Sequence, residues 1–347
     1  MRPSNSELAE LLARQAETSS GILVRAFKRA ARSAFLWREQ AAALLATGRE
    51  LTELHGVGPF LARQLREWIE KPSAGDRRAP AIRRDFLTTA DARVILAADP
   101  KWTALLRGDL QMHTVWSDGS ATVLEMAQAA KERNYDYIAI TDHSKGLKIA
   151  GGIDEKDLAR QGAEIAKANR ALRACGLTVL RSIEMNLNPR GEGDMDPKSL
   201  QHLDLVLGAF HSSLRTKEDQ TDRYLAALRN PEIQILGHPR GRIYNFRLGL
   251  KADWPRVFAE AAKLDKAMEI DCYPDRQDLN VALLKIARKE GARISLGTDA
   301  HHADQLAFIE LGLAAALKAR IPAGRILNFM ALASLRAWVE KLRTRRR

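Results

Sequence analysis

Seven short apolar runs, separated by amphipathic segments of helical length, constrain the fold of this chain more than any other feature. The first run is LLRGDLQM, which ends at Met112, and the last is ARISLGT, which ends at Thr298. Strands that alternate with helices at this spacing form a parallel sheet, and seven such units are enough to close a barrel. The sequence therefore predicts an α/β fold over this region. The five runs in between are YDYIAIT, LTVLRSIE, LDLVLGAF, IQILG and KAMEIDC.

Polar side chains of the kinds that bind metals stand at the ends of these runs. In a barrel of parallel strands the βα loops open at one mouth, so residues at the carboxyl ends of the strands converge there. A single buried histidine is more often a structural residue that donates to a backbone carbonyl. Several histidines and carboxylates at one rim would leave buried charges unpaired unless they held ions. The candidates from this pattern are Asp118, Glu184, Asp299 and five of the chain's eight histidines, His113, His143, His211, His238 and His301.

The composition of the chain limits the partners and the cellular compartment that we expect for it. Lys and Arg number 55 against 43 Asp and Glu, a net charge of +12 that favours an anionic partner; a basic surface without such a partner is the alternative. Cys175 and Cys272 are far apart and form no CxxC pattern, so neither a disulfide framework nor a thiolate metal site is expected. We expect a cytoplasmic protein without a membrane span, because no signal peptide and no run of about 18 apolar residues is found.

A change of pattern divides the chain into two domains. Residues 5–70 carry helical periodicity almost throughout, which predicts a small all-helical module. The segment KPSAGDRRAPA, residues 71–81, is rich in Pro, Gly, Ala and charge, as linkers are. The predicted boundaries are a helical module at 1–70, a linker at 71–103 and a barrel domain at 104–340.

Six segments of the barrel region resemble, in their order along the chain, the motifs of the PHP (polymerase and histidinol phosphatase) superfamily. They are DLQMHTVWSDG, AITDHS, SIEMN, GAFHSS, GHPRGR and GTDAHH. The segments GHPRGR and MEIDCYPDRQDL are most similar in sequence to the domain that follows bacterial family-X DNA polymerases. The resemblance implies a distorted (β/α)7 barrel with up to three divalent metal ions, Mn or Zn, with Fe also open. The ligands that it implies are Gln111, His113, Asp118, His143, Glu184, His211, His238, Asp299 and His301.

Gln111 is where this sequence departs from the superfamily pattern, which has His at that position. The resemblance assigns Gln111, His113, Glu184 and Asp299 to one ion, so only this ion loses an imidazole. An amide oxygen is a neutral and harder donor, which should weaken Zn²⁺ relative to Mn²⁺ without abolishing binding. We therefore expect a working centre with one altered ligand. The other two implied sets are Glu184, His211 and His238, and Asp118, His143 and His301.

Mixed imidazole and carboxylate ligands around two or more ions favour phosphoester hydrolysis. Neighbouring ions lower the pKa of a bound water and neutralise charge on the phosphoryl oxygens. Arg240 follows His238 closely and is predicted to clamp the phosphate in catalysis, with a solvated loop charge as the alternative. Asp142 is predicted to serve catalysis by orienting the centre rather than by binding an ion. Further phosphate-binding candidates are Arg242, Arg247 and Arg276.

The stretch LTELHGVGPFLARQLREWIE near the end of the module resembles a helix-hairpin-helix element. Gly56 and Gly58 lie in its bend, where glycine lets the backbone approach a phosphate and leaves amides free at the next helix N-terminus. Together with Arg63 and Arg66 they are the predicted DNA-binding residues. Such elements grip the sugar-phosphate backbone without reading sequence. An ordinary turn between two helices is the alternative.

The resemblance and the module together imply a metal-dependent phosphoesterase that acts on DNA, either a 3′ to 5′ exonuclease or a related end-processing or repair nuclease. Only about 30 residues separate the hairpin from the barrel, too few for the palm and fingers of a polymerase. Two alternatives stay open. One is a phosphatase for small phosphomonoesters of the histidinol-phosphate type, and the other is a non-catalytic DNA-binding protein with a structural metal cluster.

Overall fold

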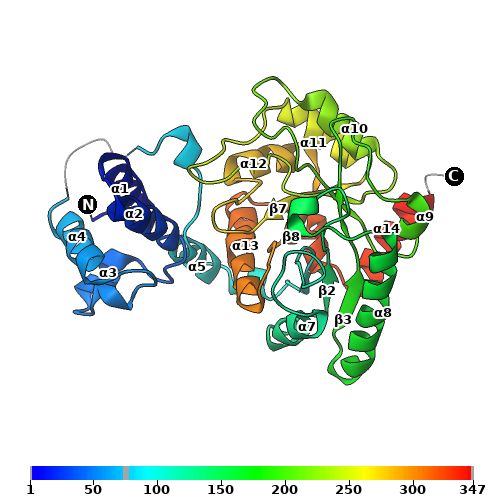
Figure 1. Ribbon diagram of the computed structural model, residues 1–347, viewed down its shortest axis with the longest axis horizontal. Coiled ribbons are helices and arrows are strands. Elements are labelled where there is room, and N and C mark those ends of the chain that lie inside the picture. The colour runs from blue at the N-terminus through cyan, green and yellow to red at the C-terminus, as the bar shows by residue number, and fades with distance from the viewer. Residues whose placement is uncertain (1, 73–77, 345–347) are drawn as a thin grey trace.

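The computed structural model describes residues 2–72 and 78–344, and it places a helical module beside an α/β barrel (Figure 1). The first helix of the module begins at a capping box, in which the Ser4 hydroxyl accepts from the amide of Glu7 and the Glu7 carboxylate accepts from that of Ser4. Apolar side chains such as Leu12, Phe27 and Leu65 form the core of the module. Its elements are α1 (Asn5–Thr18), α2 (Ile22–Ser33), α3 (Ala41–Ala46), the 3₁₀ turn η1 (Leu51–Glu53) and α4 (Pro59–Glu70).

A tight bend between η1 and α4 forms the predicted hairpin. Gly56 has a φ of 75°, and a Cβ at this position would lie only 2.7 Å from the Ser33 hydroxyl, so a larger residue does not fit without displacement. Gly58 is the N-cap of α4 and has no side chain to cap it, and Pro59 is the first helical residue. The N-terminus of α4 is therefore presented without a side-chain cap.

Residues 78–103, which the sequence assigns to the linker, contain regular structure. They form η2 (Ala81–Arg83), α5 (Thr89–Ala97) and α6 (Pro100–Thr103). Thr88 caps α5 through a capping box with Asp91. Helix α5 packs against α13 (Ile309–Lys318) of the barrel, so this part of the segment is anchored rather than free. Residues 73–77 of the predicted linker lie outside the described residues.

Parallel strands form the barrel, and their spatial order follows the chain. One sheet has the order β1-β2-β3 and the other β4-β5-β6-β7-β8. Only two residues separate β3 from β4, so the eight short strands correspond to the seven predicted runs, and the α/β barrel prediction is confirmed. Parallel bridges from Met112 to Ala300 and from His143 to Glu184 join the two sheets. The strands are β1 (Gly108–Asp109), β2 (Tyr137–Ile140), β3 (Thr178–Arg181), β4 (Glu184–Asn186), β5 (Leu207–Ala209), β6 (Ile235–Leu236), β7 (Ala267–Asp271) and β8 (Arg293–Gly297).

Helices cover the outside of the barrel (Figure 1). Their buried residues recur every three or four positions, as in α11, where Trp254, Val257, Phe258 and Ala261 face the core. None of the described helices is long and apolar enough to cross a membrane. Besides α13, these helices are α7 (Val123–Glu132), α8 (Glu155–Ala171), α9 (Pro197–Leu200), α10 (Thr221–Arg229), α11 (Trp254–Lys263), α12 (Val281–Glu290) and α14 (Leu332–Thr344). The 3₁₀ turns are η3 (Lys148–Ala150), η4 (Arg173–Cys175), η5 (Ala303–Phe308), η6 (Ala323–Arg325) and η7 (Leu327–Phe329).

A loop of the barrel contacts the module directly. This loop, residues 239–250, follows β6 and is called the docking loop below. Its Tyr244 is buried in the apolar cluster of the module. Residues 78–103 are called the connecting segment below. The Tyr244 ring packs edge-on against Phe35 of the module, with ring centroids 4.8 Å apart, and against Phe86 of the connecting segment, with ring centroids 5.4 Å apart. Edge-to-face aromatic pairs of this kind add about 1 kcal/mol each beyond the area that they bury.

An ionic contact reinforces the same junction. Arg83, in the connecting segment, donates to Glu10 Oε2 at 2.7 Å and to Glu17 Oε1 at 2.5 Å, both on α1. It also donates to the side-chain oxygen of Asn245 on the docking loop at 3.0 Å. The Arg83 and Glu10 side chains are only 6% and 3% exposed. Module, connecting segment and docking loop are thus tied together at one buried guanidinium.

Candidate metal centre

The structure brings the nine predicted ligands together where the strands end. Their side chains form one connected cluster, in which neighbouring nitrogen and oxygen atoms lie 3.9 Å apart or less. Eight of them come from the segments that follow β1, β2, β5, β6 and β8, and Glu184, separated from β3 by two residues, is the first residue of β4. Parallel strands place these ends at one mouth, which is why residues so far apart in sequence meet here.

Glu184 is the centre of the cluster. It is fully buried, and its Oε1 lies 2.7 Å from His238 Nε2 and 2.9 Å from His211 Nε2. Burial disfavours the charged carboxylate, but the neighbouring imidazoles, His143 and His238 foremost, outweigh this and hold the pKa of Glu184 well below its usual value. Glu184 is therefore a permanent anion among imidazoles. Its Oε2 contacts Gln111 Nε2 at 3.2 Å, and His113 Nε2 and His143 Nδ1 at 3.3 Å.

Asp118 gathers a second group of imidazoles at the outer edge of the cluster. Its Oδ1 lies 3.3 Å from His301 Nε2, 3.6 Å from His143 Nε2 and 3.9 Å from His113 Nδ1. The His113 ring is stacked between those of His143 and His301, with centroids 4.3 and 4.5 Å away. Burial opposes the charge on Asp118, but hydrogen bonds with His143 and His301 lower its pKa. This group is again an anion held against imidazoles.

Two of the predicted ligands have strained backbones. His238 has a φ of 22° and Asp299 a φ of 52°, values that residues other than glycine rarely adopt. Such conformations cost about 1–3 kcal/mol each and persist where the surroundings impose them, most often at functional sites. The strain directs Asp299 Oδ1 to within 2.9 Å of His113 Nε2.

The buried donors of the cluster suit a divalent cation. Both ring nitrogens of His113, Nδ1 of His143 and Oε1 of Gln111 have no hydrogen-bond partner, although all are buried. Native proteins leave few such atoms without a partner, and divalent cations bound in the cluster would supply partners for them. Imidazole and carboxylate donors in this number suit Zn, Mn or Fe.

The groupings differ in part from the predicted ligand sets. The structure places His113, Glu184 and Asp299 close enough to share an ion, as predicted, with Gln111 beside Glu184. A second group contains His143, Glu184 and His211, where His143 stands in place of the predicted His238. His238 still contacts the same Glu184 oxygen as His211. The third group, Asp118, His143 and His301, gains His113.

Asp142 shapes the loop beside the cluster and has no contact of its own with the ligand side chains. Its carboxylate accepts from the Thr114 amide at 2.8 Å, the Thr114 hydroxyl at 2.6 Å, the Ser117 hydroxyl at 2.5 Å and Gln161 Nε2 at 2.6 Å. These bonds fix the turn between His113 and Asp118. The hydrogen bonds of Asp142 therefore hold the loop that carries His113 and Asp118.

A cavity of about 230 Å³ opens above the cluster, and Arg240 does not line it, whereas the other three candidate arginines do. Arg242, Arg247 and Arg276 line it together with Asp118, His143, His211, His238, Asp299 and His301. The Arg276 guanidinium contacts Asp299 Oδ2. Arg240 lines a neighbouring cavity instead, and its guanidinium donates to the Leu248 carbonyl at 2.7 Å. The Arg242 guanidinium donates to the carbonyls of Arg276 and Asp85, at 2.7 and 2.9 Å, and Arg247 and Arg276 are the other arginines of this lining.

The predicted DNA-binding residues lie apart from this cavity, on the module. Arg63 is exposed on α4, one turn after Gly58. Arg66 is partly engaged, because its guanidinium lies 3.3 Å from Glu50 and 3.7 Å from Glu70. Arg63 is thus the freer of the two cations.

Several residues that support the cluster were missed by the sequence reasoning. The side-chain oxygen of Asn186 pairs with His211 Nδ1 at 3.1 Å, and Glu269 accepts from the backbone amide of His238 at 2.7 Å. Asn186 follows Glu184 by two positions on a strand, so the two side chains share a face, and this period-two relation was an available signal. For Glu269 the signal was an acidic residue inside an apolar strand; burial raises its pKa well above the usual value.

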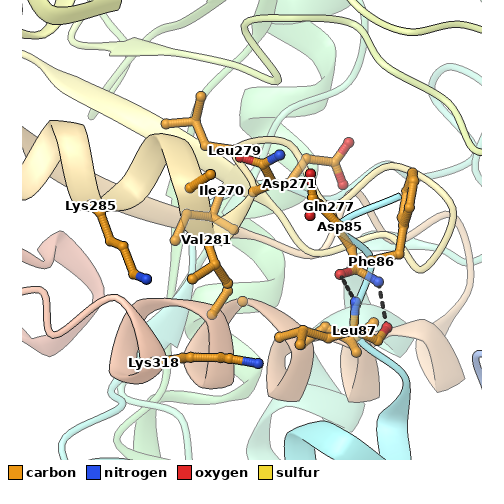
Figure 2. Close-up of a pocket in the computed structure, with 15 residues that line it drawn as sticks. Asp85, Phe86, Leu87, Ile270, Asp271, Gln277, Leu279, Val281, Lys285 and Lys318 are labelled. Atoms are coloured by element: carbon orange, nitrogen blue, oxygen red, sulfur yellow. Dashed lines mark hydrogen bonds between the residues drawn. The ribbon is translucent and has the colours of Figure 1, made fainter. Parts of the chain in front are cut away.

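A larger cavity, of about 300 Å³, lies elsewhere and contains none of the nine ligands. Figure 2 shows it between the segment Asp85–Leu87, the end of β7 and helices α12 and α13. The Gln277 side chain accepts from the Leu87 amide and donates to the Leu87 carbonyl, each at 2.7 Å (Figure 2). These bonds fasten the connecting segment to the barrel, so the cavity marks a joint between them.

The chain is similar to several known proteins. Residues 109–277 match the family model described as PHP domain. The DNA polymerase/3′-5′ exonuclease PolX of Bacillus subtilis (strain 168) is 34% identical over 237 residues, which cover 68% of this chain and only 41% of that protein. A probable phosphatase of Photobacterium profundum is 33% identical over 58% of this chain and 81% of the phosphatase. The crystal structure of histidinol phosphate phosphatase from Lactococcus lactis subsp. lactis Il1403, complexed with Zn, L-histidinol and phosphate, is 17% identical over 62% of this chain and 94% of that one, with a TM-score of 0.45.

Proposed function

This chain belongs to the PHP domain family of metal-dependent phosphoesterases, and we propose that it hydrolyses DNA from the 3′ end. The observation that carries the proposal is the cluster of five imidazoles and three carboxylates beneath a cavity bordered by three arginines. The Bacillus subtilis relative, named as a 3′-5′ exonuclease, supports DNA as the substrate class. In this proposal residues 1–70 bind DNA, 71–103 connect, and 104–340 hydrolyse.

The nine cluster residues would hold the ions, which supply a water of lowered pKa and neutralise charge on the phosphoryl oxygens. Glu184 joins the inner groups, because each of its oxygens contacts imidazoles on a different side. Arg247, which lines the cavity beside them, offers a guanidinium to a phosphate oxygen. Asp142 fixes the loop between His113 and Asp118 and so keeps these ligands in register.

The positive charge on the surface of the module supports a polymeric substrate with many phosphates. Four exposed cations of α2 lie three or four positions apart, which places them on one face of the helix. The uncapped N-terminus of α4 and the exposed Arg63 add to this basic surface. The docking loop runs from His238, through Tyr244 on the module, back to Arg247 at the cavity. The docking loop would therefore connect a DNA strand bound by the module to the metal centre. The α2 cations are Arg25, Lys28, Arg29 and Arg32.

Cleavage of end-labelled DNA tests the proposal. Single-stranded and gapped DNA labelled at the 5′ end should give a ladder of shortened products with Mn²⁺, and less product with Zn²⁺, because Gln111 is the harder donor. His211→Ala should lose the ladder, while His202→Ala, a histidine outside the cluster, should keep it. Arg63→Gln should raise the KM for DNA several-fold and leave hydrolysis of a small chromogenic diester unchanged. Equal activity of His211→Ala and the wild type would contradict the proposal.

Arg240 and Arg247 of the docking loop make a matched pair. Arg247→Gln should raise the KM for a phosphodiester by roughly 10-fold or more, because a charge-assisted hydrogen bond contributes about 1.5–3 kcal/mol. Arg240→Gln should change KM less than about 2-fold, since Arg240 lines the neighbouring cavity. Steady-state kinetics on the chromogenic diester measures both. A larger effect of Arg240→Gln would restore Arg240 as the phosphate clamp.

A phosphatase acting on small phosphomonoesters is the second candidate function. The match to the Photobacterium profundum protein, named a probable phosphatase and covered over 81% of its length, favours it. A phosphatase function gives no role to the basic face of α2 or to the hairpin. Turnover of small phosphomonoesters without cleavage of DNA would select this candidate, and tight DNA binding without any turnover would select a structural metal cluster.

A further inference from the structure

Two buried side chains at the altered ligand position lie beside the same glycine and have unused hydrogen-bonding capacity. Gln111 follows β1, Glu269 lies in the middle of β7, and both are fully buried. The Oε1 atom of each has no hydrogen-bond partner. A Cβ added to Gly297 of β8 would lie 2.9 Å from Gln111 Oε1 and would also meet Glu269 Oε1, so the two atoms share the space beside this glycine. Two acceptors placed together without a donor are costly in a protein interior.

A half-turn of the Gln111 amide would satisfy both atoms. Its Nε2 lies 3.2 Å from Glu184 Oε2, and its Oε1 is on the side of Glu269. The nitrogen and oxygen of an amide have nearly the same shape, so a half-turn exchanges them without moving other atoms. Nε2 then faces Glu269 Oε1, and Oε1 faces Glu184 Oε2. Two oxygens that face each other are stable when both bind the same cation.

We propose that Glu269 is the positioning residue that makes Gln111 a metal ligand. Its carboxylate accepts an N–H of the Gln111 amide and so directs the amide oxygen at the ion shared by His113, Glu184 and Asp299. The other carboxylate oxygen, Oε2, is held by the backbone amide of His238 at 2.7 Å, which keeps Glu269 in place. The inference rests on the proposed metal-dependent function. It also explains how the centre works without the usual imidazole, because an amide that is turned the wrong way presents N–H to a cation.

Mn²⁺ binding to the full-length chain tests this inference by a double-mutant cycle. Gln111→Met removes the amide, and Glu269→Gln keeps the shape but leaves one oxygen to serve two donors. Each single variant should weaken one class of Mn²⁺ site by roughly 10-fold, the usual effect of losing a residue that orients a metal ligand. The double variant should be no weaker than either single variant, because Glu269 acts through Gln111. Gln111→His in the Glu269→Gln background should restore the affinity, since an imidazole needs no amide orientation.

Isothermal titration calorimetry and the metal content after dialysis provide the readout, so no step depends on DNA hydrolysis. Ser295→Ala is the matched control, because this buried serine of β8 also has a side-chain oxygen without a partner and is not among the ligands. Thermal unfolding shows whether each variant folds. Losses that multiply to about 100-fold in the double variant, or unchanged binding in Glu269→Gln, would overturn the inference alone. A wild-type chain that binds no Mn²⁺ would overturn the proposed function as well.

Discussion

Replacing Glu184 with Gln is expected to lower the rate of phosphodiester hydrolysis by at least about 10³-fold, because the cluster loses the anion that joins its inner groups. The carboxylate contacts His211 and His238 through one oxygen and His113 and His143 through the other. A Gln amide offers one oxygen and presents N–H groups to the remaining partners. The number of tightly bound Mn²⁺ or Zn²⁺ ions per chain should fall together with the rate.

Single-turnover cleavage at saturating Mn²⁺, together with metal analysis of the same preparation, measures both effects. Glu192→Gln is a suitable control, because Glu192 is an exposed acid eight positions further along, paired with Arg190. Its activity and metal content should match those of the wild type. If Glu184→Gln folded with its full complement of metal and kept more than about a tenth of the activity, the cluster would not be the site of catalysis.

Arg83→Met should destabilise the module by about 3 kcal/mol, the usual cost of leaving a buried charge without its partner. Glu10 is 3% exposed, and Arg83 provides two of its hydrogen bonds, at 2.7 and 3.0 Å. Arg14 remains in contact with Glu10, which limits the loss. The variant also loses the bond to Asn245, so the docking loop is less firmly held. Differential scanning calorimetry should show the transition of the module at a lower temperature.

Arg84→Met is the control, because the guanidinium of the exposed Arg84 donates to the Ala79 carbonyl and to no other residue that the structure describes. Its unfolding free energy should stay within about 0.5 kcal/mol of the wild type. Adding Glu10→Leu to Arg83→Met should recover most of the loss, since the buried carboxylate no longer lacks a partner. Equal shifts for Arg83→Met and Arg84→Met would show that the junction contributes little to stability.

The strand ends could be predicted from the sequence because their information is local. An apolar run followed by His or Asp specifies both a buried strand and the residue at its end, and parallel strands bring these ends to one mouth. Asp118 was also placed correctly beside imidazoles, through the short loop after β1. Asp142 was predicted to orient the centre; the structure gives it three hydrogen bonds to the loop and one to Gln161, and its role stays a prediction.

The arginines show where local information ends. Arg240 is two residues from His238, and its nearness in sequence favoured it as the phosphate clamp. In the structure the docking loop folds back on itself through a bridge between Ile243 and Arg247. The fold returns Arg247 to the cavity and leaves Arg240 against the Leu248 carbonyl. Sequence distance cannot show such a reversal, because it depends on the conformation of the whole loop.

By itself the sequence determined the α/β class, the helical character of the module and the residues that stand at the barrel mouth. These follow from periodicity, since an apolar pattern sets which face of each element is buried. Only the tertiary structure decided which donors lie close enough to share an ion, which arginines line the cavity, that Glu269 and Gln111 meet beside Gly297, and that Tyr244 joins the core of the module. Each of these depends on contacts between residues far apart in the chain, which packing fixes and local pattern does not encode.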